Sequence, residues 1–169
     1  RRGTEAAVAS HAIGEDVLII DPAVQLALPL PLERLGEALL LRPIGSSDAG
    51  AVPLAVQDGR VTAALPVAER LFQHTGQVHA GAMATLADHS MGSAAQTLAP
   101  EGHWALTAEL KTSQLRPGRG ERLVCEAWVV KAGRRLSFTE AEVWGEAADG
   151  TRTLVMKASA TMALVPKDD

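Results

Sequence analysis

One stretch of nineteen residues constrains the fold of this chain more than any other segment. It runs from His79 to Thr97 (HAGAMATLADHSMGSAAQT), contains no proline, and has Ala, Gly or Ser at ten of the sixteen positions from 80 to 95. A surface helix normally carries charged side chains on its outer face, yet this stretch has no Lys, Arg or Glu. We therefore expect a helix over about residues 79–97 that is buried on nearly all sides.

The rest of the chain after residue 53 alternates with a period of two, which is typical of strands with one buried face. The expected strands are 60–67, 104–115, 123–131, 136–146 and 151–165, and turn sequences such as Ala148-Asp149-Gly150 separate the last four. Four consecutive long strands with short turns predict an antiparallel meander. Together with the buried helix they predict an α+β fold in which a long antiparallel sheet wraps around one central helix.

The first fifty residues have a different pattern. Three prolines interrupt an apolar stretch at 17–32, leucines at helical spacing follow over 32–41, and residues 44–51 have the composition of a loop. We expect residues 1–50 to be an N-terminal extension with a short helix and residues 51–169 to form the main domain.

Composition excludes several classes of protein. The chain has 16 basic and 20 acidic residues, a net charge of −4, and only five aromatic residues, which argues against nucleic acid or an anionic membrane as the partner. Its single cysteine, Cys125, excludes an internal disulfide framework, and no cluster with metal-ligand spacing is present, so no metal is expected. No apolar run is long enough to span a membrane, and we expect a cytoplasmic protein.

Asp88 is the one carboxylate of the expected helix, with Ala84, Ala87, Met91 and Gly92 as neighbours on it. A buried carboxylate is normally paired, protonated or catalytic, because removing it from water costs several kcal/mol. A structural ion pair is the alternative to a catalytic role.

A polar, glycine-punctuated loop, Gln73 to Gly81, leads directly into the helix. Free backbone N–H groups at a helix N-terminus can polarise a carbonyl, and Ala80 adds little bulk there. Ala80 and Asp88 are eight residues apart, which is roughly 12 Å along a helix and too far for both to act on one carbonyl carbon. If both serve one site, that site needs two copies of the helix in a two-fold dimer.

The segment from Gln73 to Asp88 (QHTGQVHAGAMATLAD) resembles the motif of hotdog-fold acyl-CoA thioesterases, in particular their phenylacetate-pathway (PaaI-like) branch. That motif reads Asn or Gln, then Gly, His-Gly-Gly, and a carboxylate on the central helix. The likeness covers about residues 60 to 165. The chain departs from the motif at Ala80, which replaces the first Gly of His-Gly-Gly. Alanine keeps the amide, and its methyl group narrows the approach of the substrate.

The resemblance implies hydrolysis of an acyl- or aryl-acyl-CoA to the free acid and coenzyme A, with no cofactor. Asp88 would activate water as a general base or attack the thioester directly. The Ala80 N–H and the Gln73 amide would polarise the carbonyl, and Thr107 would orient the water. The site would lie at the interface of a homodimer, which could pair further into a dimer of dimers.

Four more residues are candidates for substrate binding. His79 and Gly81 begin the helix, and His79 would order the loop rather than transfer protons. Arg116 and Arg134 lie at strand ends, where arginines can hold the phosphates of coenzyme A. For each arginine, a solvated turn is the alternative interpretation.

Two other functions stay open. The same fold supports acyl-CoA sensors without catalysis, since fold alone does not set function. It also supports hydratases and dehydratases, which resemble a different motif with an Asp–His pair.

Overall fold

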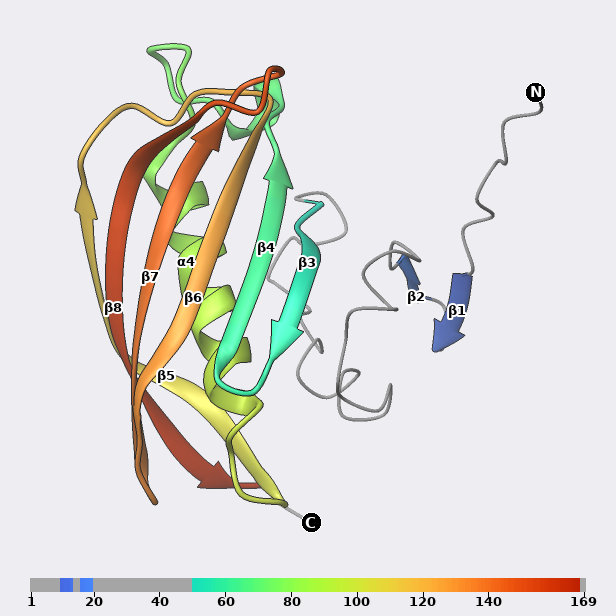
Figure 1. Cartoon of the computed structure of the whole chain (residues 1–169), viewed down its shortest axis with the longest axis vertical. Coiled ribbons are helices and arrows are strands. Elements are labelled where there is room, and N and C mark those ends of the chain that lie inside the picture. Colours follow the sequence, from blue (N-terminus) through green and yellow to red (C-terminus); the bar gives the residue numbers. More distant parts are fainter. Residues whose placement is uncertain (1–9, 14–15, 20–49, 168–169) are drawn as a thin grey trace.

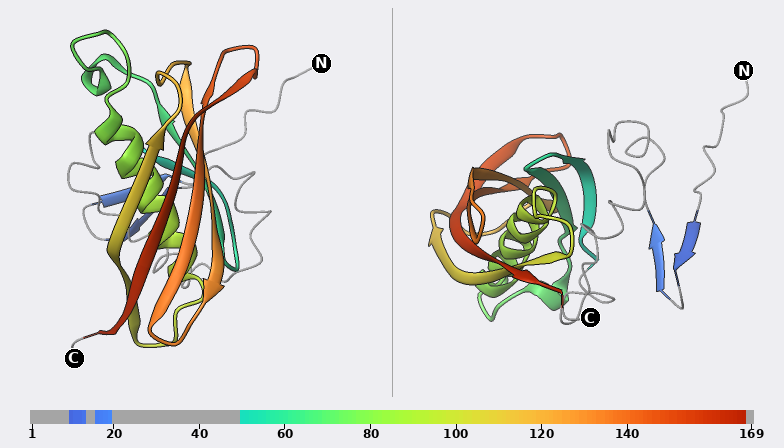
Figure 2. Two further views of the ribbon diagram at one scale, coloured as in Figure 1. Left: turned by 90° about the vertical axis from the view of Figure 1, so that its left-hand side faces the viewer. Right: turned by 90° about the horizontal axis from the view of Figure 1, so that it is seen from below.

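The computed structural model describes residues 10–13, 16–19 and 50–167, and within them a single long helix packs into a curved antiparallel sheet (Figures 1 and 2). The helix is α4, Ala80–Gln96, so the expected helix over about 79–97 is confirmed. Seen from below in Figure 2, the sheet curls around α4. The predicted α+β fold, a sheet wrapped around one helix, is confirmed.

The large sheet has six strands in the order β3-β4-β6-β7-β8-β5, with every neighbouring pair antiparallel. Its strands are β3 (Val52–Gln57), β4 (Arg60–Pro66), β5 (His103–Gln114), β6 (Arg122–Ala132), β7 (Leu136–Glu146) and β8 (Arg152–Pro166). The bounds of the five expected strands agree with these within one residue. Strand β3 was not among the expected strands, and a short 3-10 helix, Glu69–Leu71, follows β4.

The predicted four-strand meander is wrong in one respect. Strands β6, β7 and β8 form a meander, but β5 pairs with β8 at the far edge instead of with β6. The linker 115–121 crosses the ends of β8 and β7, where the backbone N–H groups of Leu115 and Arg116 both donate to the Val155 carbonyl. Three strand spacings are about 14 Å, a distance that seven residues span easily.

One face of α4 packs into the sheet. It is formed by Met83, Leu86, Ala87, Ser90, Met91, Ser93, Ala94 and Ala95. The opposite face is not covered within one chain: Gly81 and Thr85 are exposed, and Asp88 and Gly92 are half-buried. The expectation of burial on nearly all sides is therefore wrong for the single chain, because the sheet encloses the helix from one side only.

The N-terminal fifty residues are described in part. Strands β1 (Ser10–Ile13) and β2 (Asp16–Ile19) form an antiparallel pair that the sequence pattern did not predict. The short helix expected within 32–41 lies outside the described residues, and the division at residue 50 stays a prediction. No helix in the described ranges is long and apolar enough to cross a membrane.

Candidate active site

Asp88 and Thr107 meet between the middle of α4 and the edge strand β5. The Thr107 hydroxyl donates a hydrogen bond to Asp88 Oδ1 at 2.8 Å and lies 3.5 Å from Met162 Sδ. Asp88 is half-buried and Thr107 is exposed, so a small molecule can reach both. Because the hydroxyl proton points to the carboxylate, the lone pairs of the hydroxyl oxygen and Asp88 Oδ2 can both accept hydrogen bonds from one water.

A β-bulge at Ala108 aims Thr107 at the helix. The register with β8 shifts between Thr107 and Glu109, so that Thr107 lies opposite Met162 and Leu110 lies opposite Ala160. Both partners on β8 are buried on the side of the helix. In a regular strand, residues 107 and 110 would face opposite sides of the sheet.

The start of α4 leaves one backbone amide available. His79 is the N-cap, and its Nδ1 accepts from the Gly81 N–H at 2.8 Å, while its carbonyl accepts from the Ala82 N–H at 3.0 Å. In the described part of the chain the Ala80 N–H donates to no acceptor, and Ala80 is exposed. An exposed amide at the positive end of a helix can polarise a carbonyl oxygen.

The cap also explains why the motif retains its second glycine and not its first. A Cβ added to Gly81 would lie 2.9 Å from His79 Nδ1, closer than real Cβ atoms approach another atom. The methyl group of Ala80 is exposed. The change from His-Gly-Gly to His79-Ala80-Gly81 is therefore compatible with the cap.

Gln73 lies in a tight turn just before the helix. The Gly76 N–H donates to the Gln73 carbonyl at 2.9 Å, the Gln73 N–H donates to the Gln77 carbonyl at 2.8 Å, and Gly76 has a φ of 72°. These features form a type I turn closed by a glycine in the left-handed region. The side-chain Nε2 of Gln73 donates to Thr75 Oγ1 at 2.9 Å, a contact that sequence reasoning missed.

Of the four candidate catalytic residues, the structure brings Asp88 and Thr107 into direct contact. Gln73 and Ala80 belong to the same loop and helix start, but they do not contact each other: the loop folds back on itself with Phe72 opposite Val78 and the Gln73 N–H bonded to the Gln77 carbonyl. Eight helical residues separate Ala80 from Asp88, roughly 12 Å of rise, so one chain does not bring Ala80 and Asp88 to one carbonyl.

The two arginine candidates lie at opposite ends of β6. Arg116 precedes the strand and donates from Nη1 to the Leu154 carbonyl at 3.0 Å, whereas Arg134 is exposed in the turn after it. A strand of 11 residues is roughly 35 Å long, so the two side chains do not share a site within one chain.

Three other titratable groups have shifted pKa values. Burial lowers the pKa of His89 to about 4, and within the described part of the chain its Nε2 has no hydrogen-bond partner. Burial raises the pKa of the Cys125 thiol to about 12, which fits the expected core residue and not a nucleophile. Hydrogen bonds from Arg152 and Arg122 lower the pKa of Glu146. Among the described residues no group of three or more His, Cys, Asp or Glu could hold a metal ion.

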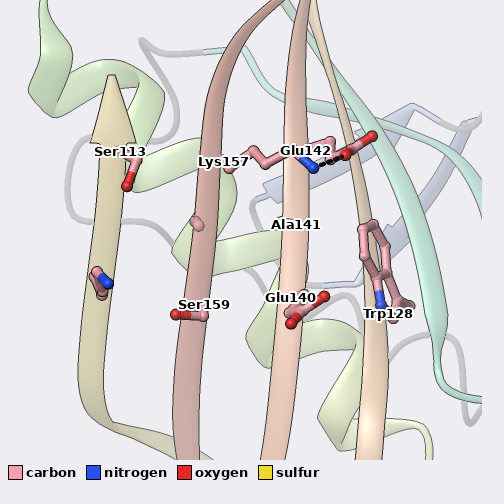
Figure 3. Close-up of a pocket in the computed structure, with 9 residues that line it drawn as sticks. Ser113, Trp128, Glu140, Ala141, Glu142, Lys157 and Ser159 are labelled. Atoms are coloured by element: carbon pink, nitrogen blue, oxygen red, sulfur yellow. Dashed lines mark ion pairs between the residues drawn. The ribbon is translucent and has the colours of Figure 1, made fainter. Parts of the chain in front are cut away.

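A hollow of about 230 Å³ lies on the face of the sheet that points away from helix α4 (Figure 3). It spans β5 to β6, and Lys157 and Glu142 on its wall form an ion pair at 2.7 Å. Two lysines and two glutamates line it, so it offers no charge of one sign to a phosphate. It lies on the face of the sheet opposite to Asp88 and Thr107.

Comparison with known proteins identifies the family. The family model described as "Thioesterase superfamily" matches residues 75–149. A thioesterase family protein from Silicibacter pomeroyi is 30% identical, with a TM-score of 0.74 over 80% of this chain and 98% of its own. The protein PA1618 of Pseudomonas aeruginosa is 32% identical over 114 residues, which are 66% of this chain and 75% of that protein. A protein from Bacillus halodurans, solved with CoA, is 27% identical, with a TM-score of 0.56 over 62% of this chain and 66% of its own.

The solved structures from Silicibacter pomeroyi and Bacillus halodurans are similar in fold to this chain, with the TM-scores given above. The chain belongs to the thioesterase superfamily and has its hotdog fold.

Proposed function

We propose that this thioester hydrolase cleaves acyl-CoA esters to a free acid and coenzyme A, as a member of the PaaI-like branch. The observation that carries the proposal is the hydrogen bond from the Thr107 hydroxyl to the Asp88 carboxylate. Asp88 lies on helix α4, which begins with the available backbone amide of Ala80. The relative from Bacillus halodurans solved with CoA supports coenzyme A as the leaving group.

The proposed active unit is a homodimer. Strand β5 is an edge of the sheet and is exposed along most of its length, on both faces. The open face of α4 beside it carries no charge except Asp88. An unpaired strand edge next to a helix face whose only charged residue is Asp88 favours association with a second copy. Antiparallel pairing of two such helices would place Asp88 of one subunit near the Ala80 amide of the partner subunit.

In this site water adds to the thioester carbonyl. Thr107 and Asp88 hold the water, and Asp88 Oδ2 takes its proton as the new C–O bond forms. The Ala80 N–H and the Gln73 amide of the partner subunit donate to the developing oxyanion. When the C–S bond breaks, the proton on Asp88 passes to the sulfur, and the acid and coenzyme A leave.

The alternative route is direct attack by Asp88 on the carbonyl carbon. This expels the thiolate and forms a mixed anhydride, which water then hydrolyses. A single turnover in water labelled with oxygen-18 detects the anhydride route when water opens the anhydride at the Asp88 carbonyl. General-base catalysis puts one labelled oxygen into every product acid. Label recovered in Asp88 itself would instead show that it acts as the nucleophile.

The two arginines can serve one composite site of a dimer although they lie at opposite ends of the sheet within one chain. Arg116 is at the end of the sheet near the helix N-terminus, since Gly118 bridges to Val78. Arg134 is at the other end, where the Arg135 carbonyl accepts from the Leu164 N–H beside the first half of β5. In the proposed dimer, Arg134 of one subunit and Arg116 of the partner subunit therefore flank the same Asp88.

The proposal is tested by thiol release from acetyl-, hexanoyl-, palmitoyl-, phenylacetyl- and benzoyl-CoA. We expect at least one ester to be cleaved by the wild type and not by Asp88→Asn. If none is cleaved but the esters bind, the protein is a sensor and the proposal fails.

Mixed dimers test the shared site. Asp88→Asn and Gln73→Ala subunits, co-expressed with different tags, form mixed dimers in which one of the two sites has both wild-type residues. Purified mixed dimers should regain about half of the wild-type activity per dimer. Activity no higher than that of the two parent variants would exclude a site shared between subunits.

A further inference from the structure

The turn before α4 contains a hydroxyl that contacts a proposed oxyanion donor. Thr75 Oγ1 accepts a hydrogen bond from Gln73 Nε2 at 2.9 Å. Thr75 is exposed, and in the described part of the chain its side chain makes no other hydrogen bond. The hydroxyl is therefore not needed to hold the turn, which backbone hydrogen bonds already close.

The backbone of Gln73 is fixed independently of Thr75. Its N–H donates to the Gln77 carbonyl and its carbonyl accepts from the Gly76 N–H, at 2.8 and 2.9 Å. The backbone hydrogen bonds do not restrict the Gln73 side chain, whose rotatable bonds let its amide group adopt many orientations. An oxyanion donor is effective only when it is aimed before the reaction begins.

The Thr75 contact limits that freedom. One hydrogen of the Gln73 amide is committed to Thr75, and the second hydrogen on the same nitrogen then has a defined direction. We propose that Thr75 is a positioning residue that orients the Gln73 amide toward the substrate carbonyl. This inference rests on the proposed function, in which Gln73 is the second oxyanion donor.

The test is a double-mutant cycle on the CoA ester that the wild type cleaves fastest in the panel above. Thr75→Val removes the hydroxyl and keeps the shape of the side chain. Because the bond is exposed and water competes for it, we expect kcat to fall about three- to tenfold with little change in KM. Thr75→Ser should restore wild-type kcat. His74→Ala, a change at the neighbouring exposed turn residue, is the matched control and should have no effect.

The decisive comparison is in the Gln73→Ala background. If Thr75 acts through Gln73, Thr75→Val causes no further loss there. An equal loss in both backgrounds would show that Thr75 supports the turn, and would overturn the inference. Wild-type kcat for Thr75→Val, or for Gln73→Ala, would overturn it as well. Equal thermal unfolding temperatures of the variants exclude misfolding as the cause.

The two levels of failure are distinguishable. If no ester is cleaved in an Asp88-dependent way, the proposed function fails and the inference fails with it. If cleavage depends on Asp88 and Gln73 while Thr75→Val is silent, the inference alone fails.

Discussion

The hydrogen bond between Thr107 and Asp88 makes the strongest prediction, because it joins two elements that meet only through tertiary structure. Thr107→Val removes the hydroxyl and keeps the branched shape that suits a strand. The lost bond is 2.8 Å long and its acceptor is a carboxylate. Hydrogen bonds to charged groups contribute about 1.5–3 kcal/mol, which corresponds to roughly a 10- to 150-fold change in rate. Since Thr107 is exposed and water can replace the hydroxyl, we expect the low end, about tenfold in kcat.

The assay is thiol release at pH 7.5 under saturating substrate, with Thr107→Ser as the variant that keeps the hydroxyl. Thr112→Val is the matched control, since Thr112 also faces the helix side of β5, opposite Ala158, and its side chain makes no hydrogen bond in the described structure. The reasoning predicts a loss for Thr107→Val alone. Equal kcat for Thr107→Val and the wild type, or equal losses for both valine variants, would refute it.

Three further predictions follow from the helix and the core. Gly81→Ala forces a Cβ to within 2.9 Å of His79 Nδ1, so the cap must move. We expect the Gly81→Ala variant to have a lower kcat/KM. Ala80→Gly keeps the backbone amide, so we expect wild-type turnover and a loss of about 0.5–1 kcal/mol in the free energy of unfolding. The pKa of His89 is lowered to about 4 in the folded protein, so the unfolded chain binds the extra proton between pH 4 and 6.5. Stability then falls on acidification, by about 2 kcal/mol from pH 7 to pH 5. Urea unfolding at fixed protein concentration measures this, and His89→Gln should lose most of the dependence. The pKa of the Cys125 thiol is raised to about 12, so a thiol reagent at pH 8 should label it only after unfolding, and rapid labelling of native protein would contradict its burial.

Local sequence patterns predicted the helix and strands well because the type and bounds of each element depend on a short stretch of residues. Strands β7 and β8 alternate between buried and more exposed residues over most of their length, and turn sequences precede both strands. Strand β6 does not alternate, since Leu123, Val124 and Cys125 are all buried. The place of β5 could not be read in this way. Alternation shows that a strand has two faces, but it does not show which strand lies beside it. The crossing linker 115–121, and not the pattern of β5, decides that β8 is its neighbour.

The candidate site was predictable where it depended on residue type and spacing. Asp88 on the helix, the amide of Ala80 and the cap residue His79 follow from one continuous motif. The direction of Thr107 depends on a bulge at Ala108, and one extra residue in a strand reverses a side chain without a clear sequence signal. The open face of α4 was predicted as buried, because absence of charge does not distinguish burial within a chain from burial against a second one.

The pairing of β5 with β8 has a consequence for how the protein is made. Thr107 rests against Met162, 55 residues later in the sequence. When helix α4 and strand β5 have emerged from the ribosome, strand β8, which holds Thr107 in place, has not yet been synthesised. Contacts between such distant residues are slow to form, and until they do the unpaired strand is prone to aggregation. Early termination between Arg152 and Met162, in a strand with no catalytic group, should therefore abolish activity as completely as the loss of Asp88.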